Sequence, residues 1–229
     1  MEQSVLWGNT LADYRQMFDL DESALQARLL EFASGPSGVN AELTEQGIEV
    51  VSYDQRFKLP STALRDMTER DFENVLKQVQ QEPTHYQWQT YESPVALAES
   101  RRYGIDRFFE DYADGLAARR YLAGDEWMPL PFADASFDLV LSTHFFLQDS
   151  APYSLEWQAQ MIVELCRVGR ELRIFPLVDE RGEAAQGLGG LMQLLQQQHQ
   201  LGVEVRQVDY HFVPHDNAML RVWPLACEL

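Results

Sequence analysis

The sequence is poor in cysteine and has no long apolar run. Its 229 residues include two cysteines, Cys166 and Cys227, which lie among apolar neighbours and have no zinc-ligand spacing. This excludes a disulfide framework and predicts reduced thiols in a reducing compartment. The N-terminal segment carries acids early, and no segment approaches the length needed to cross a bilayer, so we expect a cytoplasmic protein.

Positive charge is also scarce. Only 18 lysines and arginines stand against 36 acids, which gives a formal net charge of -18. Such a surface repels nucleic acid phosphates and anionic membranes, so we discount both as partners. The acids are spread along the chain rather than gathered in a tail, which is typical of a well-solvated surface. With 45% hydrophobic residues, the chain is expected to form a single domain over residues 1–229.

The most informative segment is Arg28–Gly38, an apolar run that ends in an acid and is followed by a loop of small residues. It predicts a buried strand and a ligand-binding turn. A helix should follow from Val39 and end near Gly47, because glycine is favoured just after a helix C-terminus. The segment 48–54 is β-branched and again ends in an acid, Asp54, which predicts a second strand.

This strand, glycine loop, helix, strand and acid unit is typical of a nucleotide site. Small residues at Gly35 let a ligand approach the backbone, and the free N–H groups at a helix start favour an anionic group. Asp54, 19 residues beyond Gly35, is placed to accept from two ribose hydroxyls. The loop does not supply a full G-x-G-x-x-G, so a nucleoside without phosphates fits better than a dinucleotide. A nicotinamide-dependent oxidoreductase stays as a third hypothesis.

Residues from about 61 to 120 interrupt the alternation of strand and helix and predict a helical insertion. Thr68 and Asp71 form a variant capping box, which indicates a helix start, and Gly104 is expected to divide the later helix. The insertion is placed to form a lid over an acceptor pocket. Its aromatic residues could enclose a small apolar substrate, although at helical spacing such residues are more often core: Tyr86, Trp88, Tyr91 and Tyr103.

Strands and helices then alternate again. The stretch 136–142 is almost continuously apolar, which predicts a central strand covered on both faces. The chain closes with two strand-like segments whose connection is short enough for a hairpin. The strands of this half are expected at 121–125, 136–142, 172–177, 203–213 and 219–225, with helices after Ser154 and over 188–195.

Four segments together resemble the class I S-adenosylmethionine-dependent methyltransferases, and the resemblance covers nearly the whole chain. They are Leu30–Ser37, Val51–Asp54, Ala123–Asp125 and Leu130–Asp138, in the family's order and spacing. The resemblance implies an α/β fold of the Rossmann-like, three-layer type. Its mostly parallel seven-stranded sheet would carry an antiparallel strand in a C-terminal hairpin, with the helical insertion added.

By position, the resemblance also implies the cofactor-binding residues. Ala33 stands where the family has its first glycine, and alanine is small enough that we expect binding to survive. The implied contacts are Glu31, Ala33, Gly35 and Pro36 around the methionine portion, Asp54 and Gln55 at the ribose, Asp125 and Glu126 at the adenine, and Ser142 near the amino group. Tyr14 and Arg15 could reach the cofactor as well, but ordinary packing explains them.

The first hypothesis is a methyltransferase that transfers the methyl group of S-adenosylmethionine to a small molecule and leaves S-adenosylhomocysteine. The alternative is an S-adenosylmethionine-binding protein without transferase activity, a sensor or regulatory partner. No metal is implied, and no residue is assigned as catalytic. His144 is the nearest candidate base by position, but a histidine at the end of a strand more often has a structural or cofactor-contacting role. The sequence specifies neither the acceptor nor an oligomeric state.

Overall fold

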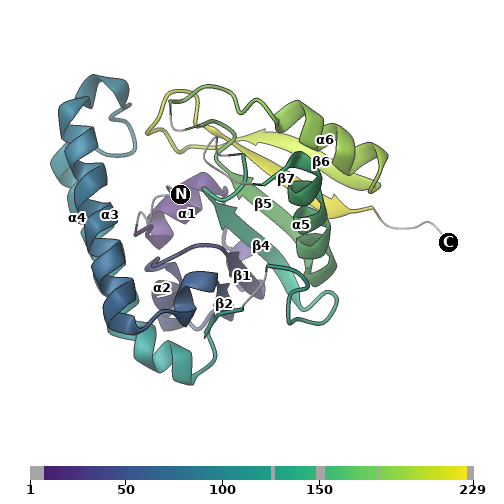
Figure 1. Ribbon diagram of the computed structural model, residues 1–229, viewed down its shortest axis with the longest axis horizontal. Helices are drawn as coiled ribbons and strands as arrows, with labels where there is room; N and C mark the ends of the chain where they lie inside the picture. Colours follow the sequence, from purple (N-terminus) through teal and green to yellow (C-terminus); the bar gives the residue numbers. More distant parts are fainter. Residues whose placement is uncertain (1–7, 125–126, 148–152, 180, 226–229) are drawn as a thin grey trace.

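The computed structural model describes residues 8–124, 127–147, 153–179 and 181–225 (Figure 1). Seven strands form one sheet in the order β3-β2-β1-β4-β5-β7-β6. All neighbouring strands from β3 to β5 pair in parallel, whereas β7 runs antiparallel to both β5 and β6. The strands are β1 Leu29–Phe32, β2 Val50–Tyr53, β3 Tyr121–Leu122, β4 Phe137–Thr143, β5 Gly169–Phe175, β6 Leu201–Gln207 and β7 Ala218–Pro224. The predicted sheet and its closing hairpin are confirmed.

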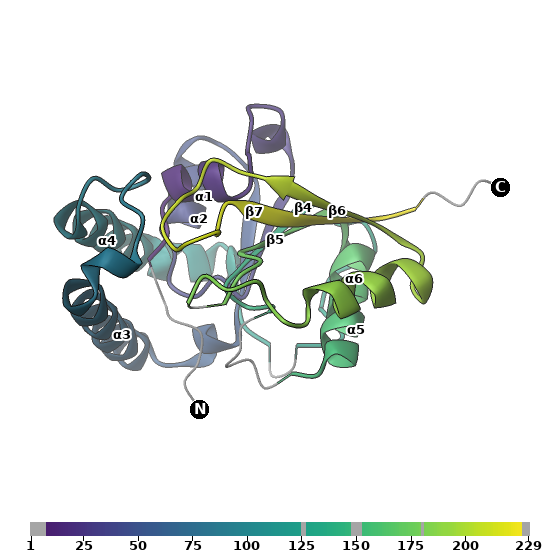
Figure 2. The ribbon, with the colours of Figure 1, turned by 90° about the horizontal axis from the view of Figure 1, so that it is seen from above.

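Helices cover both faces of the sheet and complete the three layers. Figure 2 shows α1 and α2 on one side of the strands and α5 and α6 on the other. The helices are α1 Leu11–Met17, α2 Val39–Glu45, α3 Ser61–Gln81, α4 Pro94–Ala117, α5 Leu155–Val168 and α6 Leu188–Gln197, with short 3-10 turns η1 Ala24–Gln26, η2 Gln55–Lys58 and η3 Pro83–His85. None of the helices in the described ranges is long and apolar enough to span a bilayer.

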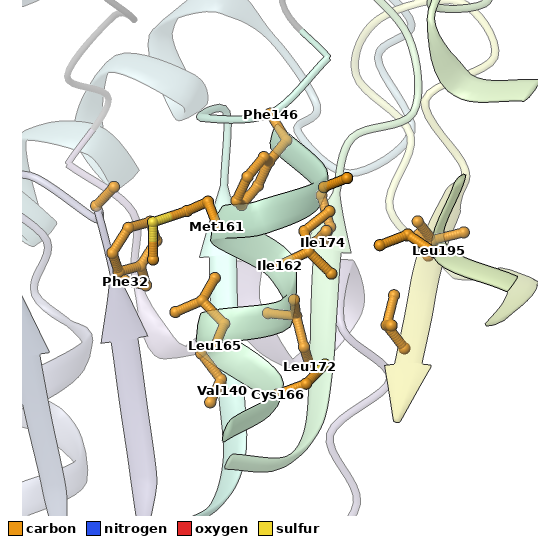
Figure 3. Packing of buried hydrophobic residues seen from close by; sticks show 14 of the residues in the cluster. Phe32, Val140, Phe146, Met161, Ile162, Leu165, Cys166, Leu172, Ile174 and Leu195 are labelled. Carbon is orange, nitrogen blue, oxygen red and sulfur yellow. The ribbon is translucent and has the colours of Figure 1, made fainter. Parts of the chain in front are cut away.

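The central strands are apolar on both faces because each face is covered by helices. Phe32 and Val140 pack against α5, where Ile162 and Leu165 form the inner face of the helix (Figure 3). Leu139 belongs to a second cluster on the α1 and α2 side. Cys166 is a free buried thiol in the first cluster, and burial raises its pKa to about 12. Cys227 lies outside the described residues.

Helices α3 and α4 pack together as an antiparallel arm beside the β3 edge of the sheet (Figure 1). Ser93 caps α4, accepting a hydrogen bond from the Ala96 N–H at 3.2 Å, and Pro94 is its first residue. The predicted break at Gly104 is wrong, because α4 runs through it. A Cβ at Gly104 would lie 2.1 Å from the Gly8 carbonyl oxygen, so glycine serves close packing of the helix there.

The expected helix start at Thr68 is also wrong. Thr68 is buried inside α3, and its hydroxyl donates to the Leu64 carbonyl one turn earlier at 2.8 Å. The helix already begins at Ser61, after Pro60. A hydroxyl that bonds back within a helix has the same sequence signature as one that caps its start.

Candidate functional site

Glu31, near the end of β1, and Asp54, directly after β2, both lie at the carboxyl edge of the sheet. Glu31 pairs in register with Ser52, and Phe32 pairs with Tyr53, so the residues after both strands share one edge. β1 has β2 on one side and β4 on the other. From β1, the sheet is built outward through β2 and β3 on one side and through β4 and β5 on the other. Open α/β sheets bind ligands at such a topological switch point.

The loop after β1 turns sharply through two left-handed residues. Ala33 has a φ of 57° and Gly35 a φ of 61°. Glycine adopts this conformation freely, whereas alanine loses roughly 1 to 2 kcal/mol in it. The Ala33 N–H donates to the Tyr53 carbonyl at 2.9 Å, which holds the loop against β2. Pro36 follows and is buried, as is most of the loop.

The Glu31 carboxyl group is buried and accepts hydrogen bonds from two serine hydroxyls. The Ser52 hydroxyl donates to one carboxyl oxygen at 2.5 Å, and the Ser37 hydroxyl donates to the other at 3.3 Å. Burial raises the pKa of Glu31 to about 7, against the opposing effect of these hydrogen bonds. Burial, together with the nearby Glu31, also raises the pKa of Tyr14 well above its usual value.

Asp54 is fully buried at the end of β2 and accepts four hydrogen bonds. One oxygen accepts from the Gly35 N–H at 2.8 Å and from the Arg56 Nη2 at 2.5 Å. The other accepts from the Arg56 N–H and the Arg56 Nε, each at 2.8 Å. The Arg56 Nη2 also donates to the Ala33 carbonyl at 3.3 Å, so this arginine joins both loops. Gln55 lies beside Asp54, half-buried, as the first residue of η2.

Ser142 and His144 lie where β4 reaches the same edge. Ser142 is buried in the strand, and its hydroxyl has no hydrogen-bond partner among the described residues. The His144 N–H donates to the Phe175 carbonyl at 2.8 Å, which fixes its backbone. Burial, and next to it the charge of Arg101, lowers the pKa of His144 to about 4. The imidazole is therefore neutral at neutral pH. Asp125 and Glu126 lie outside the described residues.

Three buried polar atoms near the carboxyl ends of β1 and β4 have no hydrogen-bond partner among the described residues. The Asn9 side chain donates to the Thr143 hydroxyl at 3.4 Å, and the Asn9 carbonyl accepts from the Gly38 N–H at 2.9 Å. Within the described part of the chain, the Asn9 Oδ1, the Tyr14 hydroxyl and the His144 Nδ1 have no hydrogen-bond partner. Buried polar atoms are seldom left unpaired, so these three mark a place for a polar group.

Sequence reasoning missed an aromatic wall beside the site. Trp127 lies 5.2 Å from Phe32, 6.4 Å from Tyr53 and 4.9 Å from Phe145 between ring centroids. These rings come from three strand ends and one loop, so no local pattern in the sequence signals the cluster. Arg56 was missed as well, because an arginine two residues after an acid is unremarkable until the fold buries the acid.

The aromatic residues of the α3–α4 connection are structural. Tyr86 stacks on Phe212 at 4.7 Å between centroids, and Trp88 lies against the same ring. Tyr91 is buried and bonded to an ion pair between α1 and α4, described below. Tyr103 is exposed on α4.

A buried ion pair joins α1 to α4. The Arg101 Nη1 donates to Asp13 at 2.5 Å, and both side chains are at most 4% exposed. The Arg101 Nη2 donates to the hydroxyls of Tyr91 and Tyr210 at 2.7 and 3.0 Å. Tyr91 also donates to Asp13. This cluster connects the arm, the N-terminal helix and the segment that precedes β7.

The strand order, with β7 antiparallel to both of its neighbours, is that of the class I methyltransferase fold, and the candidate site lies at the carboxyl ends of the strands, where open α/β sheets bind ligands. No protein-family model matches the chain. It is 25% identical over 221 residues to the uncharacterized protein MJ0045 of Methanocaldococcus jannaschii, covering 96% of each.

Solved structures with a similar fold include several methyltransferases. A TehB-like SAM-dependent methyltransferase from Corynebacterium glutamicum is 14% identical with a TM-score of 0.44, covering 94% of this chain and 88% of that one. A SAM-dependent methyltransferase from Methanosarcina mazei is 15% identical with a TM-score of 0.45, covering 90% and 94%. A structure of PigF with SAH is 14% identical with a TM-score of 0.48, covering 93% and 54%.

Proposed function

We propose that the protein is an S-adenosylmethionine-dependent methyltransferase that acts on a small molecule. One observation carries this proposal. Glu31, the turn at Ala33 to Gly35 and Asp54 lie together at the topological switch point of a class I methyltransferase sheet. A carboxylate is costly to bury, and buried acids at the ends of strands are typical of functional sites. Asp54 is the proposed partner of the ribose hydroxyls, with Gln55 beside it.

The methionine end of the cofactor fits the unpaired atoms around Glu31. The ammonium group of a bound S-adenosylmethionine would donate to the carboxylate of Glu31 and to the Asn9 Oδ1, and the carboxylate of the cofactor would accept from the Tyr14 hydroxyl. The backbone of Ala33, Gly35 and Pro36 would line this end, with Ser142 at the end of β4. No further protein group is needed to pair these atoms.

The adenine end fits the aromatic wall. Trp127 and Phe145 present apolar rings beside Phe32 and Tyr53, and purine rings stack well on such surfaces. Asp125 and Glu126, which precede Trp127 in the chain, stay the proposed partners of the adenine edge. S-adenosylmethionine, when bound, supplies an activated methyl group, so the main tasks of the chain are alignment and the exclusion of water.

The acceptor is proposed to be a small molecule rather than nucleic acid or a membrane, because the net charge of -18 repels both. Residues 61–120 are proposed to form a lid within a single domain. A cytoplasmic location is proposed because the low cysteine content is typical of proteins in a reducing compartment. His144 is neutral and next to the site, which leaves it able to accept a proton only from a strongly acidic group.

Calorimetry with S-adenosylmethionine and S-adenosylhomocysteine tests the proposal. Both should bind, and Asp54→Asn should weaken binding by roughly a hundredfold, because hydrogen bonds to a charged group contribute about 1.5 to 3 kcal/mol each. Asp138→Asn is the matched control. Asp138 also pairs with an arginine, Arg28, but at the opposite edge of the sheet, so its loss should leave binding unchanged.

A turnover screen over small hydroxy, amino and thiol acceptors then separates an enzyme from a binder. Methylation of any acceptor supports the transferase. Tight binding without turnover favours the sensor or regulatory alternative. Failure of both nucleosides to bind to wild type and to variants that free Asp54 from Arg56 would contradict both hypotheses, and binding of NAD in their place would favour the oxidoreductase.

A further inference from the structure

Every acceptor position of Asp54 is already used within the chain. A carboxylate has about four lone-pair sites, and Asp54 accepts four hydrogen bonds, two at each oxygen. Two of the four donors are the backbone N–H groups of Gly35 and Arg56, which belong to the loop and to the start of η2. The other two are the Nε and Nη2 of the Arg56 guanidinium, one at each oxygen.

A ribose diol would make the same two contacts, one hydroxyl to each carboxylate oxygen. Asp54 is 0% exposed and the Arg56 side chain is 14% exposed, so water does not compete for these positions. A nucleoside can therefore reach Asp54 only if the guanidinium leaves. The two backbone bonds can stay, because they hold the loop and not the ligand position.

We propose that Arg56 is an intramolecular gate of the nucleoside site: its guanidinium occupies Asp54 in the free protein and must be displaced by the ribose hydroxyls. This inference rests on the proposed function, since it requires a ligand with a vicinal diol. It makes the apparent affinity of the site a competition between ligand and side chain rather than a property of Asp54 alone.

The structure offers the displaced guanidinium a second carboxylate, that of Asp71 on α3. Helix α3, which carries Asp71, packs against η2, which carries Arg56, and the charge of Arg56 opposes the rise that burial causes in the pKa of Asp71. Asp71 is half-buried. A guanidinium that leaves Asp54 can therefore pair with the carboxylate of Asp71, on which its charge already acts.

This second position couples the site to the helical arm. Phe57 of η2, the neighbour of Arg56, stacks on Phe108 of α4 at 5.7 Å between centroids, and the Tyr112 hydroxyl donates to the Phe57 carbonyl at 3.0 Å. The turn that carries the gate is therefore packed against the arm that carries Asp71. Opening the gate would add an ion pair between η2 and α3 and stiffen the base of the arm.

Binding of S-adenosylhomocysteine to variants of the full chain tests the gate. Arg56→Ala should bind about tenfold more tightly than wild type, because the cost of displacing a bidentate pair is removed. Arg56→Lys keeps a charge beside the buried Asp54 but lacks the planar guanidinium that matches both oxygens, so it should fold well and still bind the ligand more tightly than wild type. Arg102→Ala is the matched control, because Arg102 forms a bidentate pair with Glu69 on the arm at 2.7 and 2.8 Å, without contact to Asp54.

Asp71 is tested by a double-mutant cycle. Asp71→Asn should weaken binding several-fold in wild type, where the guanidinium needs a second partner, and should have no effect in Arg56→Ala. A thermal melt of each variant shows that it is folded.

The outcomes separate the gate from the proposed function. If wild type binds S-adenosylhomocysteine and neither Arg56 variant binds it more tightly, the gate is wrong and the proposed function stands. If only the Arg56 variants bind, the gate is supported in its strongest form. If wild type and both Arg56 variants all fail to bind, the ribose assignment and the gate fall together.

Discussion

Two acids end neighbouring strands, and their surroundings make them chemically different. Among the described residues, Glu31 accepts hydrogen bonds from neutral hydroxyls alone, so burial dominates and raises its pKa to about 7. Asp54 is paired with a guanidinium and two backbone N–H groups, which compensate its charge. Glu31 therefore titrates near neutral pH. Asp54 is instead covered by the Arg56 guanidinium, which a ligand must displace.

Glu31 should make the stability of the protein depend on pH. Its folded-state pKa of about 7 lies above the ordinary value of 4.5, so the folded chain retains a proton that the unfolded chain has lost. The stability from this group is complete below pH 4.5 and is lost as the pH rises to 7. Glu31→Gln cannot ionise, so urea unfolding should show it gaining about 3 kcal/mol relative to wild type between pH 4.5 and 8.

Asp138→Asn is the control for this titration. Its partner Arg28 lowers the pKa of Asp138 to about 2, so the carboxylate is ionised in both states above pH 5. The difference between this variant and wild type should be flat from pH 5 to 8. An equally flat difference for Glu31→Gln would show that Glu31 is solvated or paired with a charge.

Ala33 should tolerate replacement by glycine unusually well. Its φ of 57° favours glycine, which offsets the lost methyl contacts and the greater freedom of the unfolded chain. We expect Ala33→Gly to change the free energy of unfolding by less than about 0.5 kcal/mol. Ala41→Gly, at a buried position inside α2, should cost about 1 kcal/mol or more. Equal losses in the two variants would contradict the strain assigned to Ala33.

At the scale of elements, local signals located the helices and the start of α4, but they failed at the start of α3 and at Gly104. Ser93 and Pro94 mark the start of α4 as predicted, because the cap is made by neighbouring residues. Gly104 does not break the helix, because its role is contact with Gly8, nearly a hundred positions away in sequence. The arm is also held to the body of the protein by a contact of long range, the pair of Asp13 and Arg101.

Removal of one partner from that pair should destabilise the arm strongly. Asp13→Asn removes the carboxylate charge that pairs with the buried Arg101 guanidinium, and we expect a loss of about 3 to 5 kcal/mol in urea unfolding. The double variant Asp13→Asn with Arg101→Met should lose less than the sum of the two single variants. Glu69→Gln, which breaks a pair that is about one-third exposed, should cost less than about 1 kcal/mol. Additive losses at Asp13 and Arg101 would contradict their direct coupling.

At the scale of the whole molecule, the sheet order assembles one site from segments that span most of the chain. Asn9, Glu31, Asp54, Trp127 and His144 come from five separate segments, and parallel strands bring them to one edge. The same topology places η2 between the site and the arm, so ligand binding and arm packing share a turn. The proposed coupling of the site to the arm follows from this connection and not from any sequence motif.

The sequence by itself determined the fold class, the strand that ends in Glu31, the turn through Ala33 and Gly35, and the acid at Asp54. These features depend on residues close together in the chain, where periodicity, glycine conformation and strand length act locally. Only the tertiary structure decided that Arg56 covers Asp54, that Trp127 joins an aromatic wall, and that Arg101 is buried against Asp13. Those contacts depend on which surfaces the fold brings together and removes from water, and burial is what turns an ordinary arginine or aromatic residue into part of a site.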